Sequence, residues 1–194
     1  DVAIRRAQGR GFDRVGLREG AEEAGVALGS LYKSFRSKEE IVSAAVEHQV
    51  HTLRRRFERR PARGDTALER LESLFRRLTR ALCRRPALAR ALLAALTAPE
   101  SDIAGPVYAQ EEEVGRIIVA ALRGVRPKDV DPESVTESER TLCFVLRQVW
   151  FAGMVGWAAK LYSQAEVVRQ VSGTARLLLA GLEAEGRALE GVAP

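Results

Sequence analysis

Apolar residues recur along almost the whole chain every three or four positions, which is the spacing of one face of an α-helix. No segment alternates convincingly between apolar and polar residues, as a half-buried strand does. The pattern therefore predicts an all-α protein of about nine helices. Their expected ranges are 1–10, 17–24, 28–34, 38–60, 66–84, 87–97, 106–123, 137–162 and 164–187.

Four Ser/Thr-x-x-Glu sequences predict helix starts. In such a capping box the hydroxyl accepts from a free backbone N–H, and the carboxylate accepts from the backbone N–H of the cap residue. The four pairs are Ser37 with Glu40, Thr66 with Glu69, Thr136 with Glu139, and Ser163 with Glu166. The segment 124–135 (GVRPKDVDPESV) is polar and holds two prolines, so we expect a loop there.

Short predicted helices occupy the first 60 residues and long ones follow, which indicates two domains. The fourth predicted helix has an apolar stripe made of Val42, Val46, Val50, Leu53 and Phe57. We expect this helix to pack along both parts of the molecule and to join them. The predicted division is a domain over 1–50 and a second domain over 51–194.

Composition is that of a soluble globular protein, with 46% hydrophobic and 29% charged residues. No apolar run reaches 18 residues, and the longest candidate, 149–159, is about half of a membrane span, so we expect no membrane insertion. Cys83 and Cys143 stand far apart in helical patterns and are expected to be reduced core thiols in a cytoplasmic protein. Because the chain starts at Asp1 without a methionine, we expect a preceding segment.

Positive charge is concentrated in the first third of the chain. Residues 1–64 hold 14 Lys+Arg and 9 Asp+Glu, a difference of +5, which equals the net charge of the whole chain. Such a distribution is expected where a small domain meets a polyanion. A solvated basic surface would give the same count, so charge alone leaves nucleic-acid binding open.

Residues 17–34 predict a helix, a turn at Gly25-Val26 and a second helix, which is the size of a helix-turn-helix. The second helix of this motif enters the major groove of DNA. Gly29 costs roughly 1 kcal/mol of helix propensity, but it leaves room for the close approach of the backbone to the duplex. An alternative is that this stretch is a corner of an unrelated helical bundle.

The stretch Gly11 to Ile41, "GFDRVGLREGAEEAGVALGSLYKSFRSKEEI", resembles the DNA-binding domain of the TetR family of bacterial transcriptional regulators. The family pattern is Gly-aromatic, Ala-x-x-Ala-Gly-Val, Gly-(Thr/Ser)-(Leu/Ile)-Tyr-x-x-Phe and Ser-Lys-Glu. It matches at Gly11, Phe12, Ala21, Ala24, Gly25, Val26, Gly29, Ser30, Leu31, Tyr32, Phe35, Ser37, Lys38 and Glu39.

This resemblance implies an N-terminal three-helix DNA-binding domain that contacts double-stranded operator DNA. Four small or apolar residues would approach base edges, and polar residues after them would hold phosphates. The implied DNA-binding set is Arg18, Ala27, Leu28, Gly29, Ser30, Tyr32, Lys33, Ser34 and Lys38.

The resemblance also implies that the last two long helices pair with those of a second subunit. Two recognition helices about 34–36 Å apart would then read successive faces of the major groove, so a homodimer is expected. The expected dimer interface consists of Trp157, Leu161, Val167, Val171, Leu178 and Leu182.

A pocket between helices of the second domain would be mostly apolar with a few orienting polar groups. The candidate lining residues are Leu78, Leu82, Leu92, Leu96, Ile118, Phe144, Arg147, Gln148 and Phe151. For each of them, plain core packing is the competing interpretation. Arg147 is expected either to neutralise a glutamate of 111–113 or to hold an anionic ligand group.

The order of three apolar stretches in the second domain resembles KstR-type regulators of sterol breakdown. They are "LTRALCRRPALARALLAAL", "YAQEEEVGRIIVAALRG" and "QVWFAGMVGW". This resemblance implies a small-molecule effector that is bulky and apolar, such as an acyl-CoA thioester or a sterol-like compound. We therefore expect a repressor that its effector releases from DNA, with no cofactor.

Other chemistry has little support in the sequence. His48 and His51 with Glu47 could begin a metal site, but a solvated helix face is the stronger interpretation because a site needs three or four ligands. The glutamates 111–113 are interpreted as a solvated face. No nucleophile or phosphate-loop motif is present, so an enzyme is not expected. Two alternatives stay open: a constitutive regulator whose second domain only dimerises, and a helical carrier or enzyme with a decayed DNA-binding domain.

Overall fold

The computed structural model of the chain describes residues 38–84, 86–96 and 104–190. Its helices in chain order are α3 (Lys38–Arg59), α4 (Ala67–Cys83), α5 (Pro86–Leu96), α6 (Ala104–Arg123), α7 (Glu137–Ala158) and α8 (Gln164–Glu190). Two short 3₁₀ turns, η1 (Pro127–Asp129) and η2 (Pro132–Ser134), lie in the predicted loop. These residues contain no strand, so the all-α prediction is confirmed. The expected helices over 1–10, 17–24 and 28–34 lie outside the described residues, and the count of nine stays a prediction.

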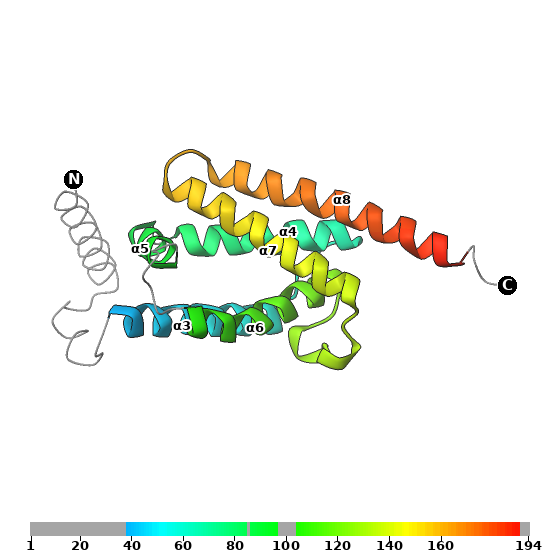
Figure 1. Cartoon of the computed structure of the whole chain (residues 1–194), viewed down its shortest axis with the longest axis horizontal. Helices are drawn as coiled ribbons and strands as arrows, with labels where there is room; N and C mark the ends of the chain where they lie inside the picture. Colours follow the sequence, from blue (N-terminus) through cyan, green and yellow to red (C-terminus); the bar gives the residue numbers. More distant parts are fainter. Residues whose placement is uncertain (1–37, 85, 97–103, 191–194) are drawn as a thin grey trace.

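The long helices form two layers with α4 between them. In Figure 1, α3 and α6 lie side by side along one edge, and α7 and α8 run as a pair along the other. The central helix, α4, packs against both α8 and α6, while α5 closes one end against α7. The C-terminal part of α8 extends beyond the rest of the bundle (Figure 1).

The core is built on one face of α4. Leu71, Leu74, Phe75 and Leu78 recur at helical spacing, and each is at most 5% exposed. From α7, the indole N–H of Trp150 donates to the buried Thr79 hydroxyl, with 2.9 Å between nitrogen and oxygen. This hydrogen bond satisfies the one polar group that the indole brings into the core.

The predicted stripe on the fourth helix is confirmed where α3 is described. Val50 and Phe57 are buried, and Leu53 packs against the same core cluster. The side chains of Val42 and Val46 lie outside the described part. Because Leu53 and Phe57 share a core cluster with residues of α6, the C-terminal half of α3 is held against that helix.

Three of the four predicted capping boxes are confirmed. At Thr66 and at Thr136 the hydroxyl accepts from a backbone N–H three residues on, 3.2 Å away in each case. Ser163 and Glu166 make the same pair of bonds, at 3.2 and 2.7 Å. The fourth box, at Ser37, lies outside the described residues. Hydroxyl caps of this kind stabilise a helix by about 1 kcal/mol.

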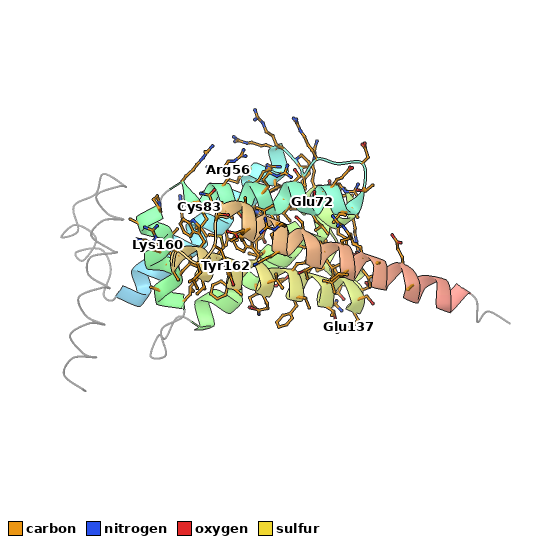
Figure 2. All side chains as sticks on the ribbon, turned by 90° about the horizontal axis from the view of Figure 1, so that it is seen from above. Arg56, Glu72, Cys83, Glu137, Lys160 and Tyr162 are labelled. Atoms are coloured by element: carbon orange, nitrogen blue, oxygen red, sulfur yellow. The ribbon has the colours of Figure 1, made fainter. Side chains whose placement is uncertain are left out.

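The predicted end of the helix 137–162 was four residues too late, because α7 stops at Ala158. Lys160 has a positive φ of 64°, and the N–H of Leu161 donates back to the Gly156 carbonyl at 2.9 Å. This is a Schellman ending, which usually uses glycine at the left-handed position. The ring of Tyr162 then folds onto Gly156, where any β-carbon would overlap it (Figure 2).

By length and composition, α7 is the one described helix that could cross a membrane. Six of its residues are buried inside the bundle, and it packs against α5, α6 and α8. Core helices of soluble proteins pass the same test of length and apolar composition. These contacts account for the apolar residues on the buried side of α7.

The C-terminal end of α6 is capped by an arginine from α4. The Arg70 guanidinium donates to the carbonyls of Ala121 and Leu122, both at 2.9 Å, and to the carbonyl of Asp65 at 3.0 Å. Gly124 ends α6 with a positive φ of 73°, and a β-carbon there would lie 3.2 Å from the guanidinium. One side chain thus joins the start of α4 to the end of α6, satisfying carbonyls that the helix leaves without partners.

Replacing Arg70 by methionine keeps the apolar stem but removes all of these donors. We expect Arg70→Met to lower the free energy of unfolding by about 2 kcal/mol, the range for a charged hydrogen-bond donor. Arg76→Met, at an exposed position on the same helix, is the matched control and should change stability by less than about 0.5 kcal/mol. Urea denaturation followed by circular dichroism measures both, and equal losses would contradict the capping role.

Candidate functional site

The expected DNA-contacting residues Arg18, Ala27, Leu28, Gly29, Ser30, Tyr32, Lys33 and Ser34 lie outside the described residues. Lys38 is the first residue of α3, and its side chain is not described. The position of the excess positive charge in the first third of the chain can be narrowed to a shorter segment. Residues 1–53 hold 8 Lys+Arg and 8 Asp+Glu, so the excess of the first third comes from the arginines of 54–63. These lie at the far end of α3, which removes charge as an argument for DNA contact at the helix-turn-helix.

A cavity of about 450 Å³ opens between α6, α7 and the loop that joins them. Its walls combine valines, a proline and an aromatic ring with three acidic and three basic side chains. The lining residues are Glu111, Glu112, Gly115, Arg116, Val119, Val130, Pro132, Glu133, Val135, Arg140, Cys143, Phe144 and Arg147. The volume lies within the range of small-molecule sites, and the mixed lining suits an apolar ligand with a few polar groups.

Two acidic side chains of the cavity wall, Glu111 and Glu112, form ion pairs, and so does their neighbour Glu113. Arg147 on α7 contacts Glu111 on α6 at 2.8 Å, which confirms the first of its two expected roles. Arg116 pairs with Glu112 at 3.3 Å, and Glu113 pairs with Arg54 of α3 at 3.4 Å. The interpretation of glutamates 111–113 as a merely solvated face was therefore incomplete, because each of them makes an ion pair.

The loop wall is held by Arg123 at the end of α6. Its guanidinium makes two bonds of 2.7 Å to the Glu139 carboxylate and reaches the hydroxyl and the carbonyl of Ser134 at 2.9 and 2.8 Å. These bonds hold the pKa of Glu139 below its usual range, and the backbone N–H of Thr136 acts in the same direction. The loop is thereby fixed to both helices that bound the cavity.

Cys143 is the one cysteine on the cavity wall, and it lies beside the Gly115 carbonyl. Burial, with a smaller contribution from Glu139, raises the pKa of its thiol to about 12. A neutral thiol is a poor nucleophile. Both cysteines are free and buried, as predicted for reduced core thiols.

The structure brings only two of the nine predicted ligand residues, Phe144 and Arg147, to this cavity. Leu78, Leu92 and Ile118 are buried in the core, as the competing interpretation held. Leu82, Leu96 and Phe151 are half-buried, and Gln148 is exposed. The loop residues Val130, Pro132 and Val135 were missed, although the two prolines among polar residues signalled a shaped loop.

The predicted interface residues divide in the same way. Val167 and Val171 are buried within the chain itself, so their side chains are covered before a second subunit is added. Trp157, Leu178 and Leu182 are half-buried. Leu161, a predicted interface residue in the turn between α7 and α8, is 72% exposed, and the other strongly exposed apolar side chains of this helix pair are Phe144 and Leu177, at 55% and 76% exposure.

His48 is exposed on α3 and so is His51 one turn later. Among the described residues, no group of three or more metal-ligating side chains lies close enough to hold an ion. The cavity lining likewise includes no histidine. The apolar surface and the paired charges of the cavity wall form an arrangement that can bind and orient a ligand.

Two family models match the chain. "Bacterial regulatory proteins, tetR family" matches residues 1–45, and "Tetracyclin repressor-like, C-terminal domain" matches residues 64–178. The second segment contains the whole cavity lining.

Similar proteins include the HTH-type transcriptional repressor KstR of Rhodococcus jostii, which is 27% identical over 92% of this chain and 80% of its own length. KstR of Mycobacterium tuberculosis is 25% identical over 92% of this chain and 78% of its own length. A crystal structure of a TetR transcriptional regulator from Rhodococcus sp. RHA1 superposes with a TM-score of 0.62 at 23% identity. It covers 91% of this chain and 97% of that one.

The Glu139 contacts predict how stability depends on pH. Because its pKa is lower in the folded chain than in the unfolded one, its contribution is present above the ordinary carboxyl pKa of 4.5 and is lost as pH falls through the folded value. We expect Glu139→Gln to cost about 1.5 kcal/mol at pH 7 and to flatten the decline below pH 4.5. Urea denaturation from pH 7 to pH 3.5, on the order of eight points, measures this.

The matched control is Glu137→Gln, because Glu137 is exposed and lies 3.8 Å from Arg140. Its stability should follow the wild-type pH profile. A Glu139→Gln profile parallel to that of the wild type would show that the Arg123 contacts do not depend on the carboxylate charge.

Proposed function

The chain belongs to the TetR family of bacterial regulatory proteins, and we propose that it is a homodimeric repressor whose cavity ligand releases it from operator DNA. The TetR family match and the KstR relatives make it a DNA-binding transcriptional regulator. Beyond this, we propose that the protein responds to an effector and forms a dimer, and we propose which residues bind the effector and which form the dimer interface. The boundary near residue 50 is part of the proposal, as is a cytoplasmic location, where operator DNA would be found.

One observation supports the effector response: α6 forms a wall of the cavity and also packs against α3. The cavity side of α6 presents Gly115 and Val119, while α3 packs along the same helix. α3 begins inside the segment that matches the tetR-family regulatory domain, and its Arg54 pairs with Glu113, which directly follows the cavity residues Glu111 and Glu112 on α6. A ligand that displaces α6 would therefore change the position of α3.

We place the effector in this cavity and assign it the class that the KstR resemblance implies, a bulky apolar molecule such as an acyl-CoA or a sterol-like compound. The valines and Phe144 would contact its apolar body. Arg147 and Arg116 are already paired with glutamates, so a neutral polar group on the ligand is better matched than a strong anion. This pairing favours a ligand that is mostly apolar at this site.

The dimer interface is placed on the outer face of α7 and α8, with a second copy of the chain as its partner. Leu161 and Leu177 are the most exposed large apolar side chains in the described part of the chain. Gly173 and Gly181 on α8 have open space where a β-carbon would lie, so helices of another subunit can approach closely. Leu178 and Leu182 would border this face, whereas Val167 and Val171 support it from within.

If the helix-turn-helix binds operator DNA, then removing the side chains that contact phosphates should weaken the binding strongly. We expect Tyr32→Ala combined with Lys38→Ala to weaken binding to a selected operator duplex by at least about tenfold, and to reduce the salt dependence. The control is Arg76→Ala with Arg80→Ala, two exposed positions on α4, which should bind within about twofold of the wild type. Fluorescence anisotropy at several salt concentrations measures both, and equal effects would contradict the assignment.

The effector proposal is tested at Gly115, where a β-carbon has no neighbour within 4 Å. Gly115→Leu places a large apolar side chain on the cavity wall, and Gly115→Ala is the matched control that adds one methyl group. An effector found by screening acyl-CoA thioesters and sterol-like compounds should lower operator affinity at least about tenfold for the wild type and for Gly115→Ala. For Gly115→Leu the change should stay below about twofold. Equal release of all three proteins would place the effector elsewhere, and release of none would favour a constitutive regulator.

A further inference from the structure

A second hollow lies where α3, α6 and the η1 turn meet. It has a volume of about 560 Å³ and is separate from the proposed effector cavity except for Arg116, which borders both. Its walls are almost entirely charged. The lining residues are Arg54, Arg55, Glu58, Arg59, Arg116, Arg126, Pro127 and Lys128, and we call this hollow the basic cleft.

The positive charges of the basic cleft are mostly unbalanced. Of its six cations, Arg54 and Arg116 pair with glutamates of α6. The other four make no ion pair with any described residue; they are Arg55, Arg59, Arg126 and Lys128. The one acid on the wall is Glu58, and its Oε2 atom is buried without a hydrogen-bond partner among the described residues.

Like charges gathered in one concave surface repel each other, and this cost is offset when an anion binds between them. The four unpaired cations come from two different elements: Arg55 and Arg59 from α3, and Arg126 and Lys128 from around η1. The arginine fork matches two oxygens of one phosphate group, and a lysine adds a point charge. Four free cations against one carboxylate suit an anion with several negative charges.

We propose that the basic cleft binds a diphosphate group and thereby ties the end of α3 to the η1 turn. The ligand class is a molecule with two linked phosphates, either inorganic diphosphate or the diphosphate of a nucleotide. Bridging α3 and η1 in this way would limit movement of α3 relative to α6.

The position of the cleft argues against DNA as its occupant. Arg54 lies 16 residues after Lys38 on one helix, so these arginines are about 24 Å from the end of α3 that adjoins the helix-turn-helix. Figure 2 shows side chains around Arg56 extending outward at the rim of the bundle, whereas the cleft residues line a concave surface.

Isothermal titration of the purified full-length chain with inorganic diphosphate and with ADP tests the proposal, at constant ionic strength and without DNA or effector. We expect saturable binding that sulfate at equal concentration does not reproduce. Arg59→Gln combined with Arg126→Gln should weaken it at least about tenfold, because one cation is lost from each side of the cleft. The matched control Arg76→Gln with Arg80→Gln, on exposed positions of α4, should bind within about twofold of the wild type.

Tighter binding of ADP would assign the nucleotide form, and tighter binding of inorganic diphosphate the inorganic form. Absence of saturable binding, equal binding of sulfate, or equal losses in the two double variants would overturn the proposal. So would a cleft variant that binds diphosphate normally but operator DNA tenfold more weakly, since the cleft would then be a nucleic-acid surface. Because the titration needs neither DNA nor effector, its failure would leave the proposed repressor function untouched.

Discussion

The described part of the molecule depends on burying one face of α4. Leu71, Leu74 and Phe75 are almost completely covered, and each buried side chain of this size contributes about 1.5–3 kcal/mol. No single helix can cover that face, so α6 packs on one side and α8 on the other, with α7 closing the gap through Trp150. The indole hydrogen bond to Thr79 fixes the depth at which α7 enters the core.

This constraint gives α6 its central position. Because α6 is anchored to α4 by the core and by Arg70, it can support α3 on one side and form a cavity wall on another. Arg123 then holds the connecting loop against α7, so the cavity is bounded by elements that are each attached to α6. A change in α6 would therefore reach both the cavity and the helix that leads into the DNA-binding segment.

Local features of the sequence predicted much of this fold. Helical periodicity identified α3 to α8, and the boxes at Thr66, Thr136 and Ser163 marked helix starts, because capping is decided within a few residues. The end of α7 was missed because Lys160 occupies a left-handed position where a glycine would have given the signal. The DNA-binding motif was recognised from its spacing, although its geometry lies outside the described residues.

Features that depend on contacts between residues far apart in the chain could not be predicted from local sequence patterns. Leu78 and Phe144 both sit in apolar helical patterns, yet one is buried in the core and the other lines the cavity with half of its surface exposed. Which face of a helix meets which neighbour depends on packing between segments far apart in the chain. The pairing of Arg147 with Glu111 was one of two stated alternatives, and only the arrangement of α6 and α7 selects it.

In the proposed mechanism, the cavity and the DNA-binding domain influence each other through α6 and α3. The most direct test measures the dissociation constant of one effector twice, for the free protein and for the protein saturated with operator duplex. Linkage requires that DNA weaken effector binding by the same factor by which the effector weakens DNA binding. We expect a factor of about ten or more in both directions. Equal effector affinity with and without DNA would show that the two sites are independent.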